Sequence, residues 1–149
     1  MMDLLSLLEE FWAWTELSPE KWWQTDLCCI AADPVLFPKS GAICNVCMEL
    51  INKDLSSDEI FLFLMGLAIN SEDEDILDQL RKTGSDAFIV SLLSAGINHP
   101  QSDARWQLAE LLRRDISNRM HYLGQLLHDP DEYVRRRACW VLQDIEHHT

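Results

Sequence analysis

The sequence has little basic charge, and the shortage is confined to its first 104 residues. Twelve Lys and Arg stand against 25 Asp and Glu among the 149 residues, so the formal net charge is −13. Residues 1–104 carry 18 acidic and 5 basic side chains, whereas residues 105–149 carry 7 of each. Such an excess of negative charge repels nucleic acid and anionic membranes and attracts basic proteins. We therefore expect a basic protein partner, no direct nucleic-acid binding and no membrane binding.

Glycine is also scarce, with 5 residues, while 48% of the chain is hydrophobic. This composition favours an all-helical globule over a disordered chain. No apolar run reaches the roughly 18 residues that a membrane-spanning helix needs, and the N-terminal residues lack the pattern of a signal peptide. The 5 cysteines, an odd number, fit a reducing compartment better than a disulfide framework. We expect a single cytoplasmic domain over residues 1–149.

Motifs for catalysis are missing as well. The sequence contains no glycine-rich phosphate loop, nucleophile elbow or Ser-His-Asp spacing. Cys44 and Cys47 form a Cys-x-x-Cys motif, which can bind zinc or carry redox chemistry, but no second pair follows at a matching spacing. Buried, reduced core cysteines are the simpler interpretation. We expect no enzyme activity, no cofactor and no metal.

The sequence repeats itself at a spacing near 30 residues. The matching positions are Pro100 with Pro130, Arg105 with Arg135 and Leu112 with Leu142, and, at the shorter spacing, Ser57 with Ser85, Leu64 with Leu92 and Asn70 with Asn98. Self-similarity at such a period is typical of stacked pairs of helices. Nine helices joined by short turns are expected, the first four over residues 4–14, 20–32, 40–52 and 60–69. Ser56 with Glu59, and Ser71 with Glu74, are predicted to form capping boxes.

The last of these helices carries the most specific pattern. Asp129 precedes Pro130, which is typical of a helix N-cap followed by proline at the first helical position. Apolar side chains then recur at three- and four-residue spacing at Tyr133, Val134, Ala138, Val141, Leu142 and Ile145. Asp-Pro followed by Val-Arg and small residues resembles the first helix of a HEAT repeat, especially of the short bacterial type.

This resemblance implies an all-α fold, an α-solenoid of about four HEAT-like helix pairs plus a terminal helix. It further implies a concave surface that grips another macromolecule. Arg135 matches the position at which the family's arginine bonds neighbouring repeats, and the carboxylates of Asp103, Asp129 and Asp131 are available to it. Together, Arg135, Arg136 and Arg137 are more typical of salt bridges than of a phosphate site.

Carboxylates cluster at the starts of the predicted middle helices. The run over residues 72–75 is one example. Helix capping and the helix dipole account for some of these acidic residues. Four consecutive acids exceed what capping needs, and their charges repel one another. Stacking of the helices would line up this run with other helix-start acids in one acidic ridge. Basic side chains of a partner would relieve the repulsion and speed the encounter.

Tryptophan is concentrated near the start, where four of the six lie between Trp12 and Trp23. Most are expected in the core. Trp22 and Trp23 are adjacent and point about 100° apart on a helix, so one of them can lie at the surface as an interface anchor. The predicted protein-binding residues are Trp22, Trp23, Asp26, Asp58, Glu59, Glu72, Asp73, Glu74, Asp75, Asp78 and Asp86.

A small, acidic, HEAT-like protein resembles bacterial immunity proteins that neutralise a nuclease toxin. We therefore expect a non-catalytic inhibitor that binds and neutralises a basic toxin domain, a nuclease. One alternative is a scaffold, adaptor or assembly factor that binds a neutral or apolar protein through the tryptophan-rich end. A HEAT-type bilin lyase is a further alternative. A HEAT-like DNA glycosylase is disfavoured, since such an enzyme needs a basic concave surface.

Overall fold

The computed structural model describes residues 3–18, 20–21 and 37–147, and its regular elements in this part of the chain are all helices. They are α1 (Leu4–Thr15), α3 (Ser40–Leu50), α4 (Ser57–Ile69), α5 (Asp75–Thr83), α6 (Asp86–Gly96), α7 (Ser102–Leu111), α8 (Arg119–Leu127) and α9 (Glu132–His147). The expected all-α fold is confirmed for these residues. The helix predicted over residues 20–32 lies almost entirely outside them. None of the described helices is both long enough and apolar enough to span a bilayer.

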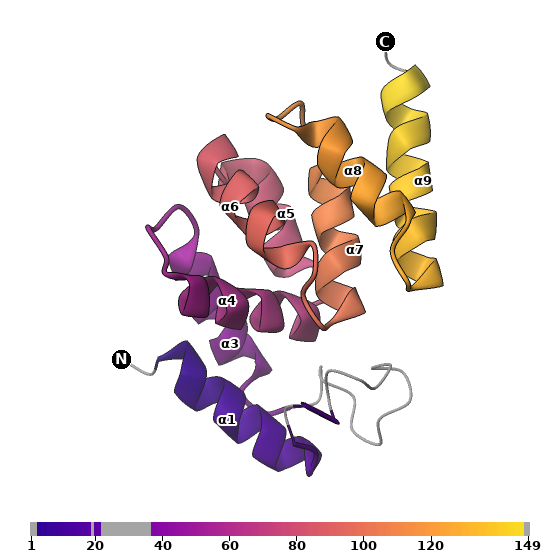
Figure 1. Ribbon diagram of the computed structural model, residues 1–149. Helices are drawn as coiled ribbons and strands as arrows, with labels where there is room; N and C mark the ends of the chain where they lie inside the picture. The colour runs from indigo at the N-terminus through magenta and orange to yellow at the C-terminus, as the bar shows by residue number, and fades with distance from the viewer. Residues whose placement is uncertain (1–2, 19, 22–36, 148–149) are drawn as a thin grey trace.

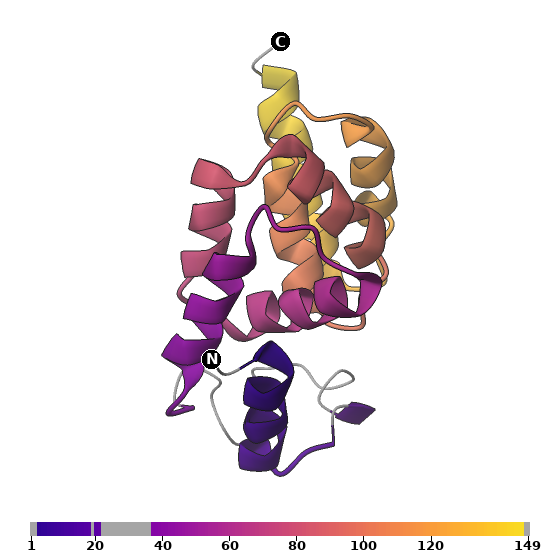
Figure 2. The same ribbon diagram turned by 90° about the vertical axis from the view of Figure 1, so that its left-hand side faces the viewer.

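The helices follow one another along the molecule, from α1 at one end to α9 at the other (Figure 1). The view turned by 90° keeps these two helices at opposite ends (Figure 2). Two helices hold the inner positions: α4 packs against α1, α3, α6 and α7, while α7 packs against α4, α5, α6, α8 and α9.

Helix α4 forms because its start is capped and its body is almost entirely apolar. The hydroxyl of Ser56 accepts a hydrogen bond from the Glu59 N–H at 3.2 Å, and Ser56 N donates to Glu59 Oε1 at 2.9 Å. This confirms the predicted capping box, although the helix begins three residues earlier than expected. Residues 63–69 are all buried. Gly66 allows α3 to come close, since a Cβ at this position would lie 2.4 Å from Cys47 Sγ.

Helix α7 buries charged and polar side chains that the repeat pattern did not predict. Arg105 donates two hydrogen bonds to the Asp129 carboxylate, from Nε at 2.8 Å and from Nη2 at 3.0 Å, and a third to the His99 carbonyl at 2.6 Å. Arg135, in contrast, donates to the backbone carbonyl of Asp129 at 2.7 Å. The expected carboxylate partner of Arg135 is therefore taken by Arg105, whose side chain is only 10% exposed.

Several long-range polar contacts join residues that are about 30 positions apart in the sequence. The pairs are Asn52 with Thr83 and Ser85, 31 and 33 residues apart, Gly84 with Arg114, 30 apart, Glu110 with Arg137, 27 apart, and Arg113 with Asp144, 31 apart. The separations follow the period of about 30 residues seen in the sequence.

Candidate protein-binding surface

The predicted acidic ridge is divided between the two ends of α4. Asp58 and Glu59 lie in the first turn of this helix, whereas residues 72–75 follow its end. Because α4 has 13 residues, it is roughly 20 Å long, and the two groups are separated by about that distance. Asp86 belongs with the first group. The residue before it, Ser85, donates a backbone hydrogen bond to Asn52, which lies in the loop that precedes α4. The sequence-based expectation of one continuous ridge is therefore corrected to two acidic groups.

Residues 72–75, here called the acidic corner, connect α4 to α5. Glu74 is the N-cap residue of α5 in the left-handed conformation, with φ 57°, and its side chain makes no capping hydrogen bond. The side-chain oxygen of Asn70 instead accepts from a backbone N–H in the first turn of α5 at 2.9 Å. The predicted capping box of Ser71 and Glu74 is therefore wrong, because Asn70 reaches the start of α5 from the end of α4.

A pocket of about 360 Å³ lies between the acidic corner and the N-terminal half of α3. Its lining combines apolar side chains with carboxylates and neutral polar groups. The apolar residues are Ile43, Met48 and Ile69, the acidic ones are Asp73 and Asp75, and the neutral polar ones include Ser40, Asn45 and Asn70. This mixture suits a ligand group with an apolar stem and a positive end.

The electrostatic field in this pocket is negative. Within residues 3–18, 20–21 and 37–147, no Lys or Arg forms an ion pair with the acidic corner. The pKa of the Cys44 thiol, which also lines the pocket, is raised by burial and further by the charges of Asp75 and Asp73. A cation in the pocket would be attracted by both carboxylates.

Two other predicted site residues have their charge compensated within the protein. Asp78 pairs with Arg81 at 3.1 Å, and Asp86 pairs with Arg114 at 3.3 Å. Asp58 is exposed and has no ion pair with any described Lys or Arg. The acidic corner and the first turn of α4 are therefore the predicted places where negative charge is available to a partner.

The predicted tryptophan anchor, Trp22 or Trp23, and the predicted contact Asp26 lie outside the described residues.

A surface cluster on α9 was missed by the sequence reasoning. Tyr133 and Trp140 are 40% and 43% exposed, and the Arg137 guanidinium lies 5.7 Å from the centre of each ring. The same guanidinium lies 4.4 Å from the Trp106 ring on α7. The spacing of Tyr133, Arg137 and Trp140 along the helix was a signal that could have identified them as one face.

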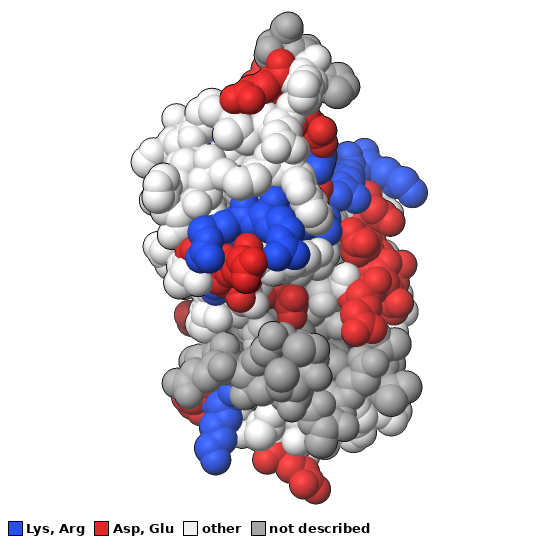
Figure 3. Space-filling model, turned by 90° about the vertical axis from the view of Figure 1, so that its right-hand side faces the viewer, with Lys and Arg blue, Asp and Glu red and all other residues white. Residues whose placement is uncertain are grey.

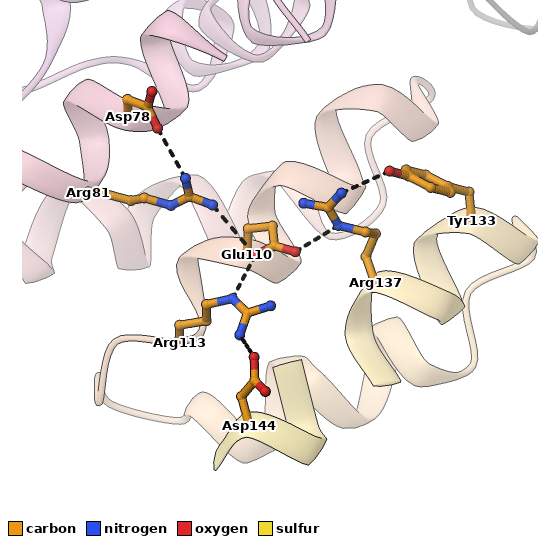
Figure 4. Close-up of polar contacts among 7 residues, drawn as sticks. All are labelled: Asp78, Arg81, Glu110, Arg113, Tyr133, Arg137 and Asp144. Carbon is orange, nitrogen blue, oxygen red and sulfur yellow. Dashed lines mark hydrogen bonds and ion pairs between the residues drawn. The ribbon is translucent and has the colours of Figure 1, made fainter. Parts of the chain in front are cut away.

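Beside this cluster, the buried carboxylate of Glu110 brings three arginines together (Figure 4). Its oxygens accept hydrogen bonds from Arg113 Nε and Arg137 Nε, each at 2.7 Å, and from Arg81 Nη2 at 3.5 Å. Burial raises the pKa of Glu110, but the hydrogen bonds and charges of Arg113 and Arg137 outweigh it, so that the net shift is downward. Asp144 pairs in turn with Arg113. These mutual pairings give the network a structural role, joining α5, α7 and α9.

Basic and acidic side chains are mixed on the side of the molecule that carries α9. Figure 3 shows Lys and Arg near the middle of this face with acidic groups between and beside them, and further acidic groups in a column along one border. Two arginines of α9 are paired with carboxylates, Arg136 with Glu132 at 2.9 Å and Arg137 with Glu110 at 2.7 Å.

No family model, curated protein or solved structure matches this chain.

The cysteines and histidines of the described residues offer no built metal site. No group of three or more His, Cys, Asp and Glu that could hold a metal ion occurs in this part of the chain. Cys44 and Cys47 are buried free thiols, and burial strongly raises the pKa of Cys47. Since the thiolate is the metal ligand and the nucleophile, raised pKa values disfavour both roles.

Proposed function

We propose that the chain is a non-catalytic, HEAT-like stack of helix pairs that binds a basic protein through its acidic corner. Hydrogen bonds and ion pairs between residues 27 to 33 apart support the stack, because they join residues about one repeat length apart in the sequence. The pocket beside the acidic corner carries the binding function. Asp73 and Asp75 line it together with apolar side chains, and neither forms an ion pair with a described Lys or Arg.

The pocket suits a lysine or arginine side chain of the partner. Its aliphatic stem would lie along the half-buried Met48, and its charge would lie between Asp73 and Asp75. A volume of about 360 Å³ falls at the small end of ligand pockets, which are roughly 300–1,000 Å³. Exposed carboxylates would also steer a basic partner towards this end of the molecule before contact.

The partner that fits this chemistry best is a basic nuclease toxin, which would make the chain an immunity protein. An enzyme that grips nucleic acid carries positive charge around its active site. The acidic corner would occupy that surface in place of phosphate groups. Inhibition would follow from exclusion of the nucleic-acid substrate.

The test begins with the partner that co-purifies with the wild-type chain from its host. Asp73→Asn with Asp75→Asn removes two charges from the pocket, while Asp54→Asn with Asp115→Asn removes two exposed charges elsewhere. We expect the first pair to weaken binding by at least tenfold and the second pair by less than twofold, since charge contacts in a dry interface are worth more than rim contacts. Equal effects of the two pairs, or a partner without basic character, would refute the proposal.

One observation favours an adaptor as the second candidate. The exposed Tyr133 and Trp140 side chains flank Arg137 on α9, and aromatic residues with arginine are typical of interface anchors. Loss of binding in Trp140→Ala, with unchanged binding in Asp73→Asn with Asp75→Asn, would favour this function over the first.

A further inference from the structure

A second hollow, of about 220 Å³, lies between α1, α3 and α4. It is at the opposite end of α4 from the acidic corner, because its lining includes Glu59 in the first turn of α4. The floor is apolar, with Leu5, Val46 and Leu62 among its side chains. Leu5 is 45% exposed and lines this groove.

Three carboxylates surround this apolar floor: those of Asp3, Glu49 and Glu59. Asp3 accepts a hydrogen bond from Ser6 N at 2.7 Å, and this bond lowers the pKa of Asp3. The pKa of Glu59 is lowered in the same way by its bond from Ser56. Both groups therefore stay ionised at neutral pH. No described Lys or Arg forms an ion pair with any of the three carboxylates.

We propose that this groove binds a segment of the basic partner in which one apolar side chain is flanked by Lys or Arg. The inference rests on the proposed function, which supplies a basic partner, and adds a second contact to it. The apolar side chain covers Leu5, and the basic residues on either side meet the carboxylate rim. Charge selects this occupant, because an apolar floor with a negative rim disfavours an acidic or neutral segment. A second copy of the chain, with its net charge of −13, is disfavoured by the same rim.

Two synthetic peptides serve as probes. Both are 12 residues long with the same number of lysines, and one carries leucine where the other carries serine. We expect the leucine peptide to bind the full chain about tenfold more tightly than the serine peptide, the order expected for burying one leucine side chain. Fluorescence anisotropy at fixed ionic strength measures both dissociation constants.

The variant Leu5→Ser tests the groove itself. It should remove most of the preference for the leucine peptide, whereas Met120→Ser, at a 56% exposed position on α8, should retain it. Glu49→Gln should weaken both peptides, and Glu9→Gln, an exposed α1 residue outside the groove, should weaken them less. Circular dichroism checks that each variant is folded.

The outcomes separate the groove from the proposed function. If both peptides bind equally, or if Leu5→Ser and Met120→Ser behave alike, the groove proposal is overturned while the basic partner stands. If neither peptide binds the wild-type chain, the groove proposal is likewise overturned, while binding of a basic partner at the acidic corner is decided separately by Asp73→Asn with Asp75→Asn.

Discussion

Replacing Glu110 by Gln would show how much one buried carboxylate contributes to holding α5, α7 and α9 together. The substitution keeps the shape of the side chain but removes the charge that faces Arg81, Arg113 and Arg137. Removing one partner from a buried ion pair typically costs about 3–5 kcal/mol, because the other charge stays buried and unpaired. Here Arg81 and Arg113 are 39% and 38% exposed and can turn towards water, so their contribution is discounted.

Arg137 is 18% exposed and carries the main cost of this substitution. We therefore expect Glu110→Gln to lower the free energy of unfolding by about 2–3 kcal/mol. For a chain of this length that corresponds to a fall in Tm of about 4–12 °C. Urea denaturation and a thermal scan, both followed by circular dichroism, measure the two quantities.

The control is Glu132→Gln, which removes a charge from an exposed pair with Arg136. Its effect should stay within about 0.5 kcal/mol. The pKa of Glu110 is lowered in the folded state, so the stability it provides is present above the ordinary carboxyl range and is lost as the pH falls through the lowered value. Equal destabilisation by the two variants at pH 7, or a difference between them that grows on acidification, would refute this reasoning.

Three further substitutions test the packing and the buried polar groups. Gly66→Ala should destabilise by about 1–2 kcal/mol, since its Cβ would lie 2.4 Å from Cys47 Sγ, and the penalty should largely vanish in a Cys47→Ala background in a double-mutant cycle. Burial lowers the pKa of His99 to about 4. The free energy of unfolding should therefore fall as the pH drops from about 6.5 towards 4, by about 2 kcal/mol at pH 5. Urea titrations of His99→Gln should lack this part of the pH dependence. Asn52→Ala removes two hydrogen bonds, to Thr83 and Ser85 at the turn between α5 and α6. It should lower the free energy of unfolding, measured from the urea midpoint, by about 1–2 kcal/mol. A change below about 0.3 kcal/mol would contradict these two hydrogen bonds.

Local features of the fold could be predicted from the sequence because they depend on neighbouring residues. Ser56 and Glu59 are three residues apart and form the predicted capping box, whatever packs around them. The box of Ser71 and Glu74 has the same spacing but does not form, since Asn70 caps α5 from the preceding helix. A four-residue pattern cannot reveal that competition.

Long-range partners were harder to predict, although the sequence contained a signal for them. Arg81 and Arg137 lie 29 and 27 residues from Glu110, which is close to the repeat period. Applying that period to charged residues would have suggested both pairs. The expected carboxylate contact of Arg135 did not form, because Arg105, at the matching position 30 residues earlier, donates to the Asp129 carboxylate instead.

For the candidate site, the residue types were predictable but their arrangement was not. The excess of acids at residues 72–75 stood out in the sequence, and these residues do remain without basic partners among the described residues. That Asp78 and Asp86 are paired with arginines depends on how α5, α6 and α7 pack. The apolar wall from α3 that completes the pocket likewise depends on three-dimensional contacts.

The rate at which the basic partner associates, measured against salt concentration, tests the acidic corner most directly. Stopped-flow traces are compared for the wild-type chain and for Asp73→Asn with Asp75→Asn between about 0.02 and 0.5 M salt, a range over which screening shortens from about 20 Å to about 4 Å. The wild-type rate should fall steeply as salt increases, and the variant should start slower and fall less. A wild-type rate that does not respond to salt, or identical slopes for the two proteins, would contradict the account.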